Sequence, residues 1–136
     1  MTFVLDASVA LAWVFDDEAS PAADHVLRRL EHESAIAPAH WPLEVANALR
    51  TAERRGRLQP TELPALRVML EGLPIEIVPV ELSTAIGALE MARTHDLTAY
   101  DATYLHLAYV RDLELATIDR CLRQACEASG VRLAVP

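Results

Sequence analysis

The sequence predicts a single-domain α/β protein, a three-layer α/β/α sandwich around a central, mostly parallel sheet. Short apolar stretches that favour strands alternate with helical stretches along the whole chain. A hydrophobic content of 52% and a charged content of 24% are typical of a globular chain, and 136 residues suit one domain. No linker, low-complexity tract or repeat divides the chain, so we expect one domain over residues 1–136.

The start of the chain is predicted to form a strand, a buried helix and a surface helix. Residues 2–5 (TFVL) are apolar and β-prone. Residues 9–15 (VALAWVF) are apolar on every face, so this helix should be buried or lie in a subunit contact. Ser20 and Pro21 combine a capping hydroxyl with a proline in the first turn, which predicts a helix from there to about His32.

The middle of the chain is predicted to hold one strand and two helices. Residues 34–38 (SAIAP) form the strand. A long amphipathic helix then runs from Pro42 to Arg55, and Gly56 ends it because glycine adopts the left-handed conformation after a helix. Residues 61–70 form another helix, whose proline falls in the first turn and is tolerated there.

The second half of the chain is predicted to repeat the strand–helix pattern, and its last two helices each begin beside an aspartate. Glycine and serine mark several of the boundaries. The expected elements are strand 75–80, helix 82–94 with Ser83 as a candidate cap, helix 99–111, strand 113–117, helix 120–128 ended by Gly130, and strand 131–135.

The charge composition excludes some functions. The net charge is −8, and all 12 basic residues are arginines, with no lysine. Phosphate-binding P-loops and Schiff-base lysine chemistry both need a lysine and are therefore excluded. The acidic total argues against tight nonspecific binding of nucleic acid, unless several of the acids are neutralised together in one metal site.

The sequence favours a location in the cytoplasm. No apolar run is long enough to span a membrane, and the N-terminal residues lack the basic and small-residue features of a signal peptide. We therefore expect a cytoplasmic protein with no membrane partner. Cys121 and Cys126 lie five residues apart with no CxxC spacing, which is typical of reduced thiols, buried or half-buried.

Four acids stand at four predicted helix starts, and each has a local explanation. Asp6 and Asp119 follow strands at positions where aspartate is a favoured N-cap. Thr98 and Asp101 have the spacing of a capping box. Glu44 lies in the first turn of its helix, where the helix dipole favours a negative charge. Taken singly, each acid is explained by capping.

Taken together, the four acids indicate a metal site. In a parallel α/β sheet the strand-to-helix turns lie at one edge, where ligands bind. Asp6 and Asp119 should share that edge, and Asp101 and Glu44 can join them if their helices start there too. Clustered carboxylates repel one another, and a hard divalent cation relieves this cost with the oxygen ligands it prefers. We therefore expect Mg²⁺, with Mn²⁺ as a substitute, and the scattered histidines offer no zinc site.

Three neutral polar residues accompany the acids in the sequence. Ser8 follows Asp6 by two positions, Thr117 precedes Asp119 by two, and Asn47 lies three residues after Glu44 on the same helix face. Their side chains either cap and hydrate the helix starts or donate hydrogen bonds that orient the carboxylates. The sequence leaves both roles open.

Three segments together resemble the PIN-domain ribonucleases, and more closely the VapC-type toxins of toxin–antitoxin pairs. They are VLDASVALAWVFDDE, PLEVANAL and LTAYDATYLHLAYVRDLELATIDRCL. The resemblance covers essentially the whole chain, and the family's acidic quartet matches Asp6, Glu44, Asp101 and Asp119, with Thr117 as its hydroxyl residue. It implies an α/β/α sandwich, Mg²⁺-dependent endonucleolytic cleavage of RNA, a homodimer, and inhibition by a small cognate antitoxin.

The hypothesis that follows assigns these residues to catalysis. Asp6 and Asp101 would be the main metal ligands, and Asp119 and Glu44 would bind directly or through water, so that water is activated to attack the phosphate. Arginines would hold the RNA along the rim, although each has a solvated helix face as its ordinary explanation. The candidates are Arg50, Arg54 and Arg120, followed by Arg55, Arg57 and Arg123.

Aromatic and histidine residues are assigned mainly to packing, because they do not cluster as in single-strand binding proteins. The residues expected in the core are Trp13, Trp41, Tyr104 and Tyr109. Tyr100 could contact a base, but packing is the favoured interpretation. His40 and His106 could act as bases, although activation of water by a metal needs no histidine.

Two apolar helices, residues 9–15 and 63–70, could supply a groove for the antitoxin or a dimer surface, or could simply be core. Other functions stay open at this point. One is a PIN nuclease of RNA maturation without an antitoxin, and another is a non-catalytic binding module in which the acids are only caps. A receiver domain of signalling proteins is disfavoured, because it needs a late lysine and a mid-chain aspartate.

Overall fold

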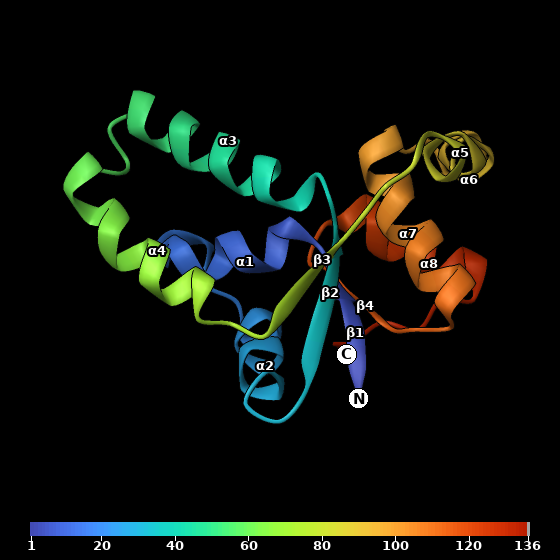
Figure 1. Ribbon diagram of the computed structural model, residues 1–136, viewed down its shortest axis with the longest axis horizontal. Helices are drawn as coiled ribbons and strands as arrows, with labels where there is room; N and C mark the ends of the chain where they lie inside the picture. Colours follow the sequence, from blue (N-terminus) through green and yellow to red (C-terminus); the bar gives the residue numbers. More distant parts are fainter. Residues whose placement is uncertain (136) are drawn as a thin grey trace.

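The computed structural model describes residues 1–135 and has a four-stranded, fully parallel sheet at its centre (Figure 1). The strand order is β3-β2-β1-β4, with β1 Thr2–Leu5, β2 Ser34–Pro38, β3 Ile75–Val78 and β4 Leu115–Ala116. The chain moves outward from β1 to β2 and β3 and then returns to the other side of β1. The switch point of this topology therefore lies between β1 and β4.

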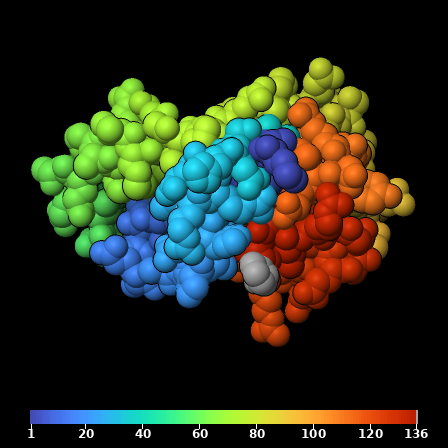
Figure 2. Space-filling view, turned by 90° about the horizontal axis from the view of Figure 1, so that it is seen from below, coloured from blue at the N-terminus to red at the C-terminus, as the bar shows by residue number. Residues whose placement is uncertain are grey.

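Helices cover both faces of the sheet, which confirms the predicted three-layer sandwich (Figure 1). On one side lie α1 Ala7–Val14, α2 Pro21–Arg29, α3 Trp41–Arg54 and α4 Leu63–Glu71. On the other side lie α5 Leu82–Gly87, α6 Leu89–His95, α7 Ala99–Arg111 and α8 Arg120–Ser129. The space-filling view shows α3 and α4 (green) at one end of the molecule and the C-terminal helices (orange and red) at the other (Figure 2).

The core lies between the sheet and the two layers of helices. Phe3, Val4 and Leu5 of β1 are completely buried, as expected for a central parallel strand covered on both faces. Helix α1 has no exposed residue, so the helix predicted over residues 9–15 belongs to the core. The Nε1–H of Trp13 donates a hydrogen bond of 2.7 Å to the carbonyl of Ala23, which ties α1 to α2.

The predicted helix caps are mostly confirmed. The hydroxyl of Ser20 accepts the N–H of Ala23 at the start of α2, and that of Thr98 accepts the N–H of Asp101 at the start of α7. Gly56 and Gly130 both have positive φ where their helices end. None of the helices within residues 1–135 is long and apolar enough to cross a membrane.

Two predicted elements are wrong in detail. Residues 131–135 form a single bridge, Leu115 with Leu133, rather than a strand, because β4 has only two residues to pair with. The helix predicted over residues 82–94 is divided at Ala88 into α5 and α6, next to Gly87, whose low helix propensity weakens the helix at this point. Ser83 is not its cap, since Glu81 occupies the cap position.

Two burial predictions are also wrong. Tyr109 is 57% exposed rather than core, because it lies in the last turn of α7, where three consecutive residues are exposed. Cys121 is exposed in the first turn of α8, whereas Cys126 is buried. Both cysteines are free thiols, as predicted.

Candidate active site

Asp6 lies at the end of β1, at the switch point of the sheet, and only 4% of the residue is exposed. Ser8 donates a hydrogen bond of 2.6 Å to Oδ2 of Asp6, and Thr117 donates one of 2.8 Å to the same oxygen. Asp6 occupies the N-cap position of α1 but makes no capping hydrogen bond with its side chain. Its carboxylate is therefore aimed at the rim of the sheet by two hydroxyls, and these bonds leave Oδ1 free.

Burial raises the pKa of Asp6 to about 6, against the stabilising effect of the two hydroxyls. Repulsion from Glu44 and Asp101 adds smaller contributions in the same direction. Ionisation of the Asp6 carboxyl is therefore less favourable than that of an exposed aspartate. A cation at this position would relieve that cost.

The turn after β4 is joined to the same hydroxyls. The Ile118 N–H donates to the Ser8 hydroxyl at 3.2 Å, and the Asp119 N–H donates to the Thr117 hydroxyl at 3.1 Å. Oδ1 of Asp119 accepts the N–H of Leu122 at 2.9 Å, so Asp119 caps α8 as predicted. Ser8 and Thr117 therefore connect the ends of β1 and β4, and they hold the two strand-end aspartates at one edge.

Glu44 lies in the first turn of α3 and is held by residues of two elements. The Tyr104 hydroxyl, from α7, donates to Oε1 of Glu44 at 2.6 Å, and Nε2 of His40 lies 3.4 Å from the same oxygen. Burial raises the pKa of Glu44, the bond from Tyr104 opposes this, and Asp101 adds repulsion. The sequence interpretation assigned Tyr104 to the core, which is correct, but missed that it positions Glu44.

Asp101 lies in the first turn of α7 and is half-buried. Burial raises the pKa of Asp101, and repulsion from Asp119 raises it further. Repulsion also couples Asp6 to Glu44 and Asp101, so the structure places the four acids near one another. We call these four residues the acidic rim. Asp6 and Asp119 follow β1 and β4 at the carboxyl edge of the sheet, and Glu44 and Asp101 lie in the first turns of α3 and α7.

The chemistry of the donor set fits a hard divalent cation, but the four side chains do not surround one point. Within residues 1–135, no three histidine, cysteine, aspartate or glutamate side chains already form a group that could hold a metal ion. The hydrogen bonds of Asp6, Glu44 and Asp119 each engage one carboxylate oxygen and leave the other to turn toward a ligand. All four donors are oxygens, the type that Mg²⁺ and Mn²⁺ prefer.

The other polar candidates lie at different distances from the acids. Asn47 is exposed one turn along α3, and within the described chain it makes no hydrogen bond to the four acids. Arg50 and Arg54 are exposed further along α3, and Arg120 is exposed directly after Asp119. Arg50 has only a long contact of 3.6 Å with Glu53, so these three arginines are accessible to a ligand.

Two further arginines already have structural roles. Arg57 pairs with Asp17 at 2.9 Å and lies over the ring of Phe15, 4.6 Å from its centroid, so it fixes the end of α3 to the turn after α1. Arg123 donates a hydrogen bond of 3.1 Å to the carbonyl of Thr117 and thereby supports the turn that carries Asp119. Arg55 is exposed at the end of α3.

Tyr100 departs from its ordinary explanation, whereas the two histidines do not. Tyr100 is 63% exposed, so the packing interpretation of this residue is wrong. His40 lies beside it, and burial lowers the pKa of the His40 imidazole. His106 lines a separate surface hollow with Tyr109, on the side of α7 that faces α6, and is not part of the acidic rim.

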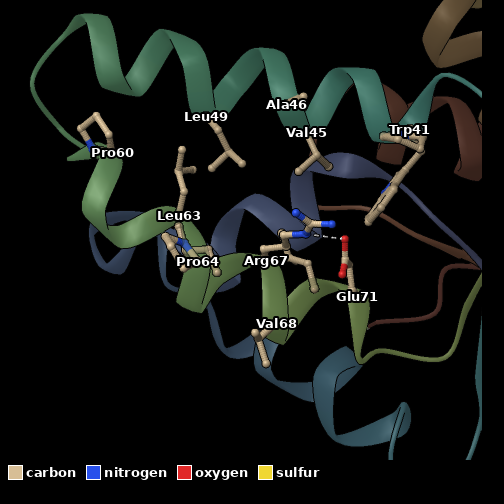
Figure 3. A pocket seen from close by; sticks show the side chains of 13 residues that line it. Trp41, Val45, Ala46, Leu49, Pro60, Leu63, Pro64, Arg67, Val68 and Glu71 are labelled. Atoms are coloured by element: carbon tan, nitrogen blue, oxygen red, sulfur yellow. Dashed lines mark hydrogen bonds and ion pairs between the residues drawn. The ribbon is translucent and has the colours of Figure 1, made fainter.

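An apolar groove of about 800 Å³ runs between α3 and α4 (Figure 3). Val45 and Leu49 point from α3 toward α4, and Leu63 points back (Figure 3). Trp41 stands at one end of the groove, and its buried Nε1–H has no hydrogen-bond partner within residues 1–135. Arg67 and Glu71 of α4 form an exposed ion pair of 2.9 Å at the edge of this groove. Helix α4 has no buried residue, so it offers its apolar side chains to this groove.

Comparison with known proteins gives a consistent result. The family model of the PIN domain matches residues 3–128. Ribonuclease VapC12 of Mycobacterium tuberculosis is 34% identical over 122 residues, which are 90% of each chain. The crystal structure of PAE2754 from Pyrobaculum aerophilum is similar with a TM-score of 0.67 and 25% identity, over 92% of this chain and 87% of that one.

A chain in the structure of a toxin–antitoxin complex from Klebsiella pneumoniae has a similar fold, with a TM-score of 0.56 and 18% identity over 86% of each chain. The matched family model spans nearly the whole chain. The chain belongs to the PIN-domain family, among the VapC-type ribonucleases.

Proposed function

We propose that this protein is a Mg²⁺-dependent endoribonuclease that acts as the toxin of a toxin–antitoxin pair. The observation that carries the proposal is the convergence of Asp6, Glu44, Asp101 and Asp119 on one rim, with the pKa of three of them raised by burial and mutual repulsion. Similarity to a protein named as a ribonuclease supports RNA as the substrate.

Asp6 and Asp101 would hold the cation, with Asp119 and Glu44 binding directly or through water. When bound, the cation supplies positive charge that activates water and offsets the charge that builds up on the phosphate. The protein supplies the geometry: Ser8 and Thr117 orient Asp6, and Tyr104 orients Glu44. Attack on the phosphate would be in line with the departing ribose oxygen.

The direct test is cleavage of an RNA pool by the purified protein with Mg²⁺ and then with excess EDTA. We expect cleavage only with Mg²⁺, and its loss in Asp6→Asn and Asp101→Asn, because each variant removes one ionised ligand. Asp24→Asn is the matched control, since Asp24 is an exposed acid in the first turn of α2. Full Mg²⁺-dependent activity in a folded Asp6→Asn or Asp101→Asn protein would contradict the proposal.

The antitoxin would bind in the groove between α3 and α4. The apolar lining suits one face of an amphipathic helix, and the unpartnered Nε1–H of Trp41 suits a polar group of the bound segment. Co-expression with the small open reading frame beside the gene should give a co-purifying complex. Leu63→Glu places a charge in the groove and should abolish that complex while leaving RNA cleavage intact. If the complex survives Leu63→Glu, the antitoxin binds elsewhere.

A homodimer is the proposed assembly. Leu82, Ile86 and Leu89 form an exposed apolar stripe along α5 and α6, at the opposite end of the molecule from the groove. An exposed apolar helix face of this kind suits contact with a second copy. Sedimentation of the purified protein should report a dimer, and Ile86→Glu should shift it to the monomer. A dimer unaffected by Ile86→Glu would use another surface.

A further inference from the structure

A small hollow of about 340 Å³ opens beside Glu44 at the edge of the acidic rim. Two exposed apolar side chains line it, Leu43 from α3 at 73% exposed and Tyr100 from α7 at 63% exposed. The other lining residues are His40, Glu44 and Asn47, with no arginine among them. A phosphate group is disfavoured here because the hollow contains a carboxylate and has no arginine to pair with phosphate.

Tyr100 is held in place at this hollow rather than loosely exposed. Nε2 of His40 donates a hydrogen bond of 3.2 Å to the carbonyl of Tyr100, and the two rings have centroids 5.5 Å apart. The same imidazole packs edge-on against Tyr104, with centroids 5.0 Å apart. Because Tyr104 is fully buried, His40 anchors the exposed ring of Tyr100 to the core. The result is a fixed aromatic platform next to Asp101.

The hollow continues into an exposed stripe along α3. Leu43, Asn47, Arg50 and Arg54 are spaced by four, three and four residues, so they lie on one face of the helix, and all four are exposed. The amide of Asn47 both donates and accepts hydrogen bonds, which suits the edge of a planar heterocycle. The arginines beyond it suit phosphates of a chain that leads away from the hollow.

We propose that this hollow binds one unpaired nucleobase of the RNA beside the cleaved phosphate, stacked on Tyr100 and contacted at its edge by Asn47. The inference rests on the proposed ribonuclease function and adds a subsite to it. Aromatic side chains stack any base, whereas an amide side chain distinguishes base edges by their donors and acceptors. A base can reach the hollow only when it is unstacked from its strand, so the substrate is single-stranded at this nucleotide.

The test is a scan of a single-stranded RNA substrate in which one base at a time is removed to leave an abasic nucleotide. In the wild type, removal of the base at one position should lower kcat/KM by about 5- to 150-fold, mainly by raising KM. This is the range for loss of one stacked base. That position-specific loss should disappear in Tyr100→Ala, because the platform is already absent. Tyr100→Phe keeps the ring and should behave as the wild type.

Tyr109→Ala is the matched control, because Tyr109 is a similarly exposed tyrosine of α7 that lines a different hollow. It should keep the wild-type abasic profile. Asn47→Ala should keep the sensitivity to the abasic nucleotide but lose any preference for the base at that position. The inference is overturned if no single position is sensitive, or if the sensitivity persists in Tyr100→Ala.

A binding measurement separates this inference from the proposed function. Fluorescence anisotropy of a labelled single-stranded RNA oligonucleotide, measured in EDTA so that metal-dependent cleavage is prevented, requires no catalysis. Weaker binding of Tyr100→Ala than of Tyr109→Ala would support the base subsite even if no RNA were cleaved. Equal binding, combined with normal Mg²⁺-dependent cleavage, would reject the subsite and leave the nuclease proposal standing.

Discussion

Thr117 shows how much of the site depends on a single hydroxyl. It is fully buried, it donates to Asp6, and it accepts the N–H of Asp119. One oxygen thus sets the orientation of an acid from each of the two strand ends. Groups that orient metal ligands typically contribute about 10- to 100-fold to metal affinity or activity.

Thr117→Val should therefore lower Mg²⁺-dependent cleavage by about 10- to 100-fold, because valine fills the same space without the hydroxyl. Steady-state kinetics against Mg²⁺ concentration should show a higher requirement for the metal. Thr103→Val is the control, since Thr103 is also buried but donates to the carbonyl of Ala99 within α7. Comparable losses in both variants would mean that a general effect on packing, rather than orientation of Asp6, accounts for the change.

At the scale of elements, α3 carries two different surfaces. Its inner face lines the groove with α4, and its outer stripe leads from the acidic rim to Arg50 and Arg54. Arg54 lies ten residues after Glu44, which corresponds to about 15 Å along a helix. It is therefore suited to a phosphate further along the RNA than the one that is cleaved.

The double variant Arg50→Ala and Arg54→Ala should weaken RNA binding similarly for all sequences. If each arginine contacts one phosphate, the slope of log affinity against log salt should become shallower by about 0.7 per contact. Arg93→Ala with Arg111→Ala is the control, because these exposed arginines belong to α6 and α7 at the other end of the molecule. An equal change of slope in the control would assign RNA binding to the overall charge instead of to α3.

At the scale of the whole molecule, Arg29 ties distant parts of the chain to α2. Its guanidinium pairs with Glu33 at 2.7 Å and with Glu114 before β4 at 3.2 Å, and it lies over the ring of Phe3. It also donates to the carbonyl of Ala134 near the C-terminus. These contacts join the first strand, the last strand and the end of the chain.

The ion pair with Arg29 lowers the pKa of Glu33, mainly through the hydrogen bond between them. The stabilisation from Glu33 is therefore complete above the unfolded pKa of about 4.3 and is lost as the pH falls through the lower folded value. Glu33→Gln should reduce the free energy of unfolding by about 1 kcal/mol or less at pH 7, because the pair is partly exposed.

Urea denaturation from pH 7 down to pH 3 checks this effect. The difference between wild type and Glu33→Gln should shrink as the solution becomes more acidic. Glu31→Gln, in the same turn and exposed, should show little difference at any pH. A difference for Glu33→Gln that stays constant or grows toward pH 3 would contradict the assigned role of the pair.

The sheet and the acidic rim were predictable because they follow from local signals. Asp6 directly follows β1 and Asp119 lies three residues after the end of β4, and in a parallel sheet both positions lie at the carboxyl edge. The hydrogen bond by which Tyr104 positions Glu44 was not predictable, because it joins residues 60 positions apart. A buried tyrosine is usually assigned to the core on sequence grounds alone. The same applies to the platform of Tyr100, since only packing against His40 distinguishes it from an ordinary exposed side chain.

The short elements were harder to predict than the long ones. Strand β4 has two residues, so sequence pattern cannot show that residues 131–135 add one bridge rather than a strand. The groove between α3 and α4 depends on the angle at which α4 returns beside α3, which no local signal specifies. The apolar side chains of α3 and α4 could be identified from the sequence, but not the fact that they line one open groove.

The central claim is that the four acids form one divalent-cation site, and Mg²⁺ titration of the purified protein tests it without any RNA. Calorimetry should give saturable binding to the wild type, with Mg²⁺ also raising the Tm, because the cation binds the folded protein and relieves repulsion among Asp6, Glu44 and Asp101. Asp101→Asn should lose both effects, and Asp24→Asn should keep them. Absence of binding to the wild type, or undiminished binding and stabilisation in Asp101→Asn, would contradict the claim.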